Sequence, residues 1–324
     1  LWRIFFMLLL VLVLILAKEA LIILFFAIVI SSALDAPVSY LESKKIPRIL
    51  GALFIFFVVL VVLSLVLYTI VPIAFLELKD FLGSFDKLNI PALGDFSTSQ
   101  ILDKLEKGIG NFTDVLLSGS ASLFDVISSV FGGIIFVITT FILSFYLVVS
   151  RSGVEKFLLA VLPAAHEERV VNIYLRARKK LGLWLQGQLI LSLIIGLVTA
   201  LGLWILGVKY SLLLGVLAGI FEVVPFVGPI FAGLLAFIIA AAVSLKLGIY
   251  VIILFIIIQQ SESQLLVPVV MKKTTGLHPV IVVVSLLAGA QIAGFIGIIL
   301  AVPVAVILQE FIEDWSERKQ RKLA

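Results

Sequence analysis

The feature that most restricts the fold is an apolar stretch at 211–243 that is broken in its middle by PFVGP at 225–229. As a single helix the stretch would be roughly 50 Å long, whereas the hydrocarbon core of a bilayer is about 30 Å thick. Pro225 and Pro229 each remove a backbone donor and disfavour the preceding helical turn. We therefore predict two half-length helices that meet at a broken tip within the membrane, where protein or a wet cavity covers the backbone. The alternative is one long span kinked by proline.

A second stretch, 279–309, resembles the first. With an offset of 69 positions, FVGPIFA at 226–232 aligns with FIGIILA at 295–301, and 6 of the 28 aligned positions from 207 to 234 are identical. The alignment places Gly228 on Gly297 and Glu222 on Gln291. Paired apolar segments interrupted by Gly or Pro point to the binding site of a transporter built from inverted repeats. We expect two re-entrant hairpins, with kinked full spans as the alternative.

The composition indicates a membrane protein. Of the 324 residues, 62% are hydrophobic and 14% are charged, and the mean hydropathy is +1.28. A soluble domain is about 45–50% apolar and about 25% charged. Long apolar runs without alternation favour helices over transmembrane strands. The predicted fold is an all-α polytopic membrane protein with about eight membrane segments, including the two hairpins.

Several kinds of chemistry are disfavoured. The chain has no Cys, and its two histidines, His166 and His278, are far apart in sequence, so a thiolate or His-rich metal site is not expected. No P-loop, HExxH, GxSxG or Rossmann pattern is present. We expect no enzyme activity, no cofactor, no bound metal and no nucleic-acid partner.

The distribution of charge predicts the orientation. Segment 151–180 carries seven basic and three acidic residues, whereas 77–125 carries eight acidic residues and four lysines. Because basic loops stay in the cytoplasm, the first segment is placed inside and the second outside, which makes the C-terminus cytoplasmic. We attribute the basic residues of 151–180 to topology and to contact with anionic lipid.

These boundaries divide the chain into six units. Within the first unit, 4–17 and 20–34 are predicted as two short spans, the alternative being one helix with an internal Lys–Glu pair at 18–19. DAP at 35–37 should end or kink the second span. The units are three N-terminal membrane spans (1–75), an extracytoplasmic amphipathic helical segment (76–125), a membrane span (126–150), a basic cytoplasmic helical loop (151–182), a transport core with two hairpin repeats (183–310) and a cytoplasmic tail (311–324).

Glu222 is the first candidate for a functional residue, because it is the only ionisable residue in 211–243 and lies three positions before Pro225. An ionisable group at that depth is a functional hypothesis by default. Burial favours the neutral form of a carboxyl group, which is compatible with proton binding. The alternative is a carboxyl group that is capped by backbone at the helix break or reached by water.

The second candidate is the polar patch QQSESQ at 259–264, inside an apolar span. Its amide and carboxylate groups could bind a cation or a polyol, or they could be hydrogen-bonding links between helices. His278, just before Pro279, is expected to start a helix at the interface rather than to relay protons. The predicted substrate- or ion-binding residues are Glu222, Pro225, Gly228, Pro229, Gln259, Gln260, Glu262, Gln264, Gln291 and Gly297.

The C-terminal half resembles a known family through motifs that follow one another over about 130 residues. They are RKKLGLWLQGQ at 178–188, PFVGP at 225–229, QQSE at 259–262, LVP at 266–268, GLHP at 276–279 and GIILAVP at 297–303. Together they resemble the autoinducer-2 exporter family of bacterial and archaeal membrane proteins. The resemblance implies a permease in a prokaryotic cell (inner) membrane that self-associates into a homo-oligomer. It also implies that members differ in substrate, some being linked to export of signal molecules and others to sodium/proton antiport.

Three hypotheses for the function follow. The first is a multi-pass secondary transporter that exports a small polar solute, such as an autoinducer-2-like signal molecule, coupled to protons or sodium through Glu222 and Glu262. The second is a sodium/proton antiporter without an organic substrate. The third is a non-transporting membrane scaffold that binds partners through 77–125.

Overall fold

The computed structural model of the protein describes residues 9, 16–65, 68, 77, 134–150, 152–164, 166–225, 227–270 and 276–323. Every regular element in these ranges is a helix, which confirms the predicted all-α class. Large apolar side chains are exposed along most of the helices, as expected for a protein whose outer surface contacts lipid. Of segment 76–125 only Glu77 is described, so the predicted amphipathic helices lie outside the described residues.

The N-terminal part is a group of apolar helices, namely α2 (Lys18–Ser43), the helix Arg48–Leu65 and α6 (Ile134–Val149). Buried Val38, Ala52, Phe56 and Val148 form their core. The Phe56 ring packs edge-on against two phenylalanine rings of α6. α2 continues through Pro37 to Ser43, so 35–37 does not end the helix, and the alternative of a kink there stays a prediction. The predicted span 4–17 lies almost entirely outside the described residues.

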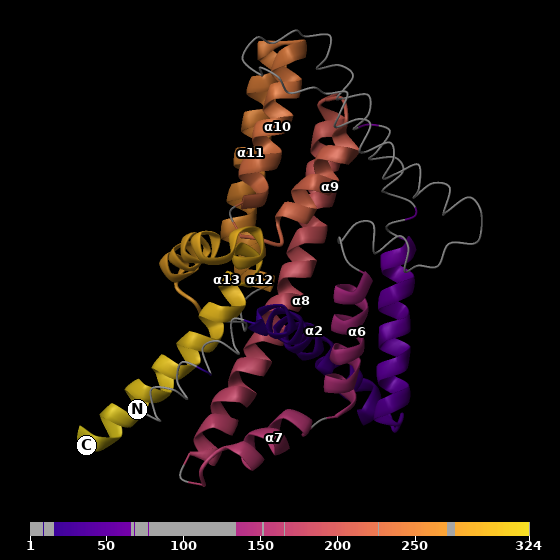
Figure 1. The fold of residues 1–324 in the computed structure, drawn as a ribbon. Coiled ribbons are helices and arrows are strands. Elements are labelled where there is room, and N and C mark those ends of the chain that lie inside the picture. The colour runs from indigo at the N-terminus through magenta and orange to yellow at the C-terminus, as the bar shows by residue number, and fades with distance from the viewer. Residues whose placement is uncertain are drawn as a thin grey trace.

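Helix α8 (Glu167–Ile205) runs through the centre of the molecule (Figure 1). Its 39 residues correspond to about 58 Å, nearly twice the thickness of the hydrocarbon core. Residues 167–182 of the predicted basic helical loop form the N-terminal, charged part of this helix. The short helix α7 (Gly153–Val161) precedes it and turns by 86° from α6. We expect α7 to lie along the membrane surface, because it exposes apolar side chains such as those of Phe157 and Val161.

The first broken stretch forms two helices, α9 (Ser211–Phe221) and α10 (Val227–Val243), as the proline and glycine pattern predicts. They are about 16 Å and 25 Å long, so neither crosses a 30 Å core alone. α9 packs on α8 and α10 packs on α11 (Leu245–Ser261), and the four helices form the upright arm of Figure 1. Buried Ile195, Leu214, Ala236 and Val251 contribute to the core between them.

After α11 the chain forms a short π-helical turn, η2 (Glu262–Leu266), and then α12 (Val267–Val270). Pro268 explains the wide turn, because its ring would clash with the carbonyl four residues earlier in a regular helix. α13 (Pro279–Leu323) is broken at Ala293 and Gly294, and Gly294 has a left-handed φ of 58°. The second break thus lies within the predicted second stretch, but the helix then continues without interruption from the predicted core into the predicted tail.

The described residues contain five helices long and apolar enough to cross a membrane, or up to six if α6 and α7 form one span. α9, α10 and the helix Pro279–Gly294 are shorter apolar helices. The total of about eight membrane segments and the inverted repeat remain predictions.

Candidate functional site

Glu222 occupies the end of α9, at the break. Its backbone N–H donates to the Ala218 carbonyl at 2.9 Å, four residues earlier. The N–H groups of the next two residues donate to the carbonyls of Ile220 and Phe221, only three residues earlier. The side chain is 1% exposed. Since α9 has 11 residues, Glu222 lies about 16 Å from the far end of the arm, which is half the thickness of a hydrocarbon core.

Glu262 lies on another segment, at the first residue of the π-helical turn, and is 7% exposed. Its carboxyl group faces that of Glu222, although the two residues are 40 positions apart. Gln259 Nε2 donates to Glu262 Oε2 at 3.3 Å. The structure therefore joins the two predicted acidic residues into one buried carboxyl pair.

Gln188 completes this site from α8. Its amide Nε2 donates to the backbone carbonyl of Glu222, and the side chain is 2% exposed. The carbonyl belongs to the last turn of α9, where the helix no longer supplies a donor. Gln188 is not among the site residues predicted from the sequence, where it belongs to the motif at 178–188. A carboxamide in an otherwise apolar segment was the available signal, but its partner could not be inferred from sequence spacing.

Gly228 lies against the pair from the other side of the break. A Cβ atom at this position would lie 2.7 Å from the Glu222 backbone nitrogen and 2.8 Å from Glu222 Oε2. Pro229 is buried beside it, and Pro225 is half-buried. The sharp turn from α9 to α10 therefore depends on a residue without a side chain.

The other predicted site residues lie elsewhere. Gln260, Gln264 and Gln291 are exposed on this single chain, and no hydrogen bond between described residues joins them to the carboxyl pair. Gly297 is buried, and a Cβ there would meet the Gly289 carbonyl within α13. His278 Nδ1 accepts from the N–H of Val280 at 3.3 Å, so His278 caps the start of α13, as predicted.

The carboxyl pair leaves one polar atom without a donor. Glu222 Oε2 is buried and accepts no hydrogen bond within the described part of the chain. Two ionised carboxylates side by side in apolar surroundings repel each other, and a shared proton or a bound cation removes that repulsion. Among the described residues, no group of three or more Asp, Glu, His or Cys side chains could hold a metal ion.

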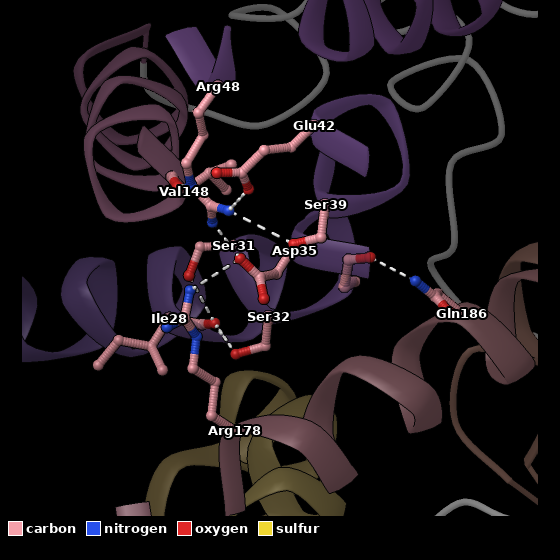
Figure 2. A network of polar contacts seen from close by, with 11 residues as sticks. Ile28, Ser31, Ser32, Asp35, Ser39, Glu42, Arg48, Val148, Arg178 and Gln186 are labelled. Atoms are coloured by element: carbon pink, nitrogen blue, oxygen red, sulfur yellow. Dashed lines mark hydrogen bonds and ion pairs between the residues drawn. The ribbon is translucent and has the colours of Figure 1, made fainter. Parts of the chain in front are cut away.

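Charged residues of α2, of the helix Arg48–Leu65 and of α8 form a second polar cluster (Figure 2). Arg48 Nε donates to the Val148 carbonyl at 2.8 Å, and its guanidinium also pairs with Glu42 at 2.9 Å and with Asp35. Arg178 pairs with the same Asp35 at 3.3 Å. This cluster ties the N-terminal helices to α8.

A third cluster joins α8 to the C-terminal half of α13. Arg176 pairs with the fully buried Glu310 at 2.8 Å, Lys180 pairs with Glu310 and Glu313, and Arg169 pairs with Asp314 at 2.7 Å. Several basic residues predicted to contact anionic lipid are thus engaged within the protein. They fix the relative positions of α8 and α13.

A cavity of about 230 Å³ lies beside these clusters rather than at the carboxyl pair. Side chains of α2, α7, α8 and α13 line it, and all are apolar except Tyr174 and Arg178. It offers few polar partners for a solute, so we do not place the transport site there.

Known proteins resemble the chain along most of its length. The family model described as "AI-2E family transporter" matches residues 4–317. "Putative transport protein YrrI" of Bacillus subtilis is 28% identical over 297 residues, which are 87% of this chain and 83% of that protein. "Putative permease PerM" of Escherichia coli K12 is 24% identical over 312 residues, covering 90% and 86%. A broken apolar arm with a buried carboxyl pair is an arrangement suited to a membrane transporter, and the chain belongs to the AI-2E transporter family.

Proposed function

We propose that the protein is a secondary transporter that exports a small polar solute and that the Glu222–Glu262 pair binds the coupling ion. The observation that carries the proposal is the position of the pair, which lies buried at the break between α9 and α10. An ionisable group buried in a membrane segment is costly and is retained mainly where it acts. Broken helices at the midplane are where secondary transporters bind substrates and ions.

The solute is expected to be an autoinducer-2-like signal molecule, that is, a small molecule rich in hydroxyl groups. The exposed carboxamides of Gln260, Gln264 and Gln291 can donate and accept hydrogen bonds to such a molecule. Polar side chains on a membrane surface usually face a wet path or a neighbouring chain rather than lipid. In a homo-oligomer these residues would be covered, and the family resemblance supports that assembly.

The test is a flux measurement with the full-length chain in proteoliposomes. We expect autoinducer-2 to cross the membrane of the proteoliposomes faster than that of protein-free liposomes. We expect Glu262→Gln to lower this flux to the protein-free rate and to abolish its dependence on an ion gradient. Glu168→Gln is the matched control, since it removes an exposed carboxyl group from the start of α8. Unchanged flux and unchanged ion dependence in Glu262→Gln would remove the pair from the mechanism.

A second candidate function is sodium/proton antiport without an organic solute. The carboxyl pair favours it, because ion exchange needs a titratable buried site and no polyol contacts. Sodium added to proton-loaded liposomes would then collapse the proton gradient in the absence of any solute. In a solute exporter coupled to one ion, the gradient would persist until the solute is supplied.

A further inference from the structure

We infer that the ion bound by the carboxyl pair is a proton shared between Glu222 and Glu262, rather than sodium. The inference rests on the proposed function, because it names the ion that this same site would carry. It starts from the geometry of the pair, in which two buried carboxyl groups face each other and Glu222 Oε2 lacks a donor. A proton on either carboxyl group supplies that missing donor, since a protonated carboxyl group has one O–H.

The neighbours of the pair present donors, not acceptors. Gln259 directs its amide Nε2 toward Glu262 Oε2, and Gln188 directs its Nε2 toward the Glu222 carbonyl. An N–H group stabilises a carboxylate and repels a cation at the same place. The pair with one proton has a net charge of −1, which the Gln259 donor can stabilise.

Three backbone carbonyls near the pair already accept hydrogen bonds. Hard cations are bound by several oxygen ligands, and helix breaks usually provide them as free carbonyls. Here the Glu222 carbonyl accepts from Gln188, and the Glu262 carbonyl accepts from the Val267 N–H. The Gln260 carbonyl accepts from the Ser263 hydroxyl at 3.3 Å. The two sites where the helices depart from regular geometry therefore have these carbonyls capped by the protein itself.

No other described charge competes for the pair. α9 and α10 contain no ionisable residue, and α11 contains Lys246 and the exposed Tyr250, both in the half of that helix away from Glu262. On α8 the ionisable residue closest in sequence to Gln188 is Lys180, which pairs with Glu310 and Glu313. Glu222 and Glu262 are thus the titratable groups that face each other in this part of the protein, and Glu262 is the charge that acts on Glu222.

The first experiment observes the proton directly. Infrared difference spectra of the full-length protein in lipid nanodiscs should show a carbonyl band of a protonated carboxyl group that shifts in heavy water. We expect Glu222→Gln and Glu262→Gln each to abolish this band, and Glu168→Gln to leave it unchanged. Sodium chloride should not displace it relative to choline chloride. Absence of the band, or its loss on adding sodium, would overturn the inference.

The second experiment separates this inference from the proposed function. Autoinducer-2 flux in proteoliposomes is driven either by an imposed proton gradient or by an imposed sodium gradient. Flux driven by protons alone supports both proposals. Flux driven by sodium alone overturns the shared proton while export stands. A proton band without any flux under either gradient supports the proton site and overturns export of this solute.

Discussion

Gly228 lies directly against Glu222, so that a Cβ atom at position 228 would come within 2.8 Å of Glu222 Oε2 and of the Glu222 Cα. The residue that permits the turn and the residue proposed to bind the ion are therefore in contact. This arrangement gives glycine at 228 a role that is separate from its flexibility. It leaves room for the carboxyl group of Glu222 to face Glu262.

The first prediction is that Gly228→Ala lowers transport strongly while Gly233→Ala does not. The added methyl group at 228 must displace Glu222, whereas at 233 it meets the Phe255 ring of α11 at 3.1 Å. Each overpacked site should cost roughly 1–3 kcal/mol of stability. The measurement is solute flux per folded molecule, with gel-filtration profiles for both variants. Equal flux in the two variants would show that contact with Glu222 is unimportant.

The second prediction compares the two glycines of the sequence repeat. Gly228→Leu and Gly297→Leu should both abolish transport in protein that still inserts. For Gly297 the structure gives a local reason, because a side chain there meets the Gly289 carbonyl across the break in α13. Membrane fractionation and detergent-extracted size profiles report whether the protein is folded. Normal transport by both variants would contradict the placement of the site at the two breaks.

The third prediction concerns Gln188 as a positioning residue. Gln188→Leu leaves the buried Glu222 carbonyl without a donor, which should cost roughly 1–3 kcal/mol. The matched control is Gln186→Leu. Gln186 lies two residues before Gln188 on α8, and its side chain donates to the Ala33 carbonyl of α2. We expect thermal unfolding to be affected in both variants. Only Gln188→Leu should also change the pH profile of transport, and the same profile in both would reduce Gln188 to a structural role.

The fourth prediction concerns the ion pairs between α8 and α13. Replacing Arg176 and Lys180 together by Met leaves Glu310 buried and uncompensated, which should cost roughly 3 kcal/mol. Adding Glu310→Leu removes the buried charge and should restore most of the unfolding temperature. Thermal unfolding in detergent is the measurement. A triple variant no more stable than the double variant would mean that these charges do not act as a unit.

The fifth prediction tests the topology. If 211–243 is a re-entrant hairpin, a cysteine introduced by Lys272→Cys in this Cys-free chain should be labelled only from the cytoplasmic side. Lys209→Cys, at the exposed turn between α8 and α9, should be labelled only from outside. Membrane-impermeant maleimides applied to intact cells and to inverted vesicles distinguish the two sides. External labelling at position 272 would mean that both long stretches cross the membrane completely.

Both helix breaks could be predicted from the sequence, because proline and glycine act on their own backbone. The break between α9 and α10 follows from Pro225, Gly228 and Pro229. The partnership of Glu222 and Glu262 could not be predicted, since it depends on how α9 and α11 each pack against α8 and α10. Both residues stood out only as carboxylates in apolar surroundings.

Two features of the helices have physical explanations. A proline within a long apolar helix is tolerated when neighbouring helices support the backbone, and α2 therefore continues past Pro37. The basic segment was predicted as a helical loop, and its charges pair with acidic residues of α2 and α13. Those pairs stabilise the N-terminal half of α8 outside the apolar region, and the sequence did not reveal them because the partners are more than 130 positions away.

The length of α8 makes it a lever. At Gly182 the helix backbone approaches that of α2 so closely that a Cβ would collide with the Ser32 carbonyl, and this contact is a natural fulcrum. Arg176, held by Glu310, and Gln188, which holds the Glu222 carbonyl, lie six residues to either side, at arms of about 9 Å each. A rigid rod pivoting at Gly182 moves its two ends by equal distances in opposite directions. A displacement of the C-terminal half of α13 would thus reach the carboxyl pair at full amplitude.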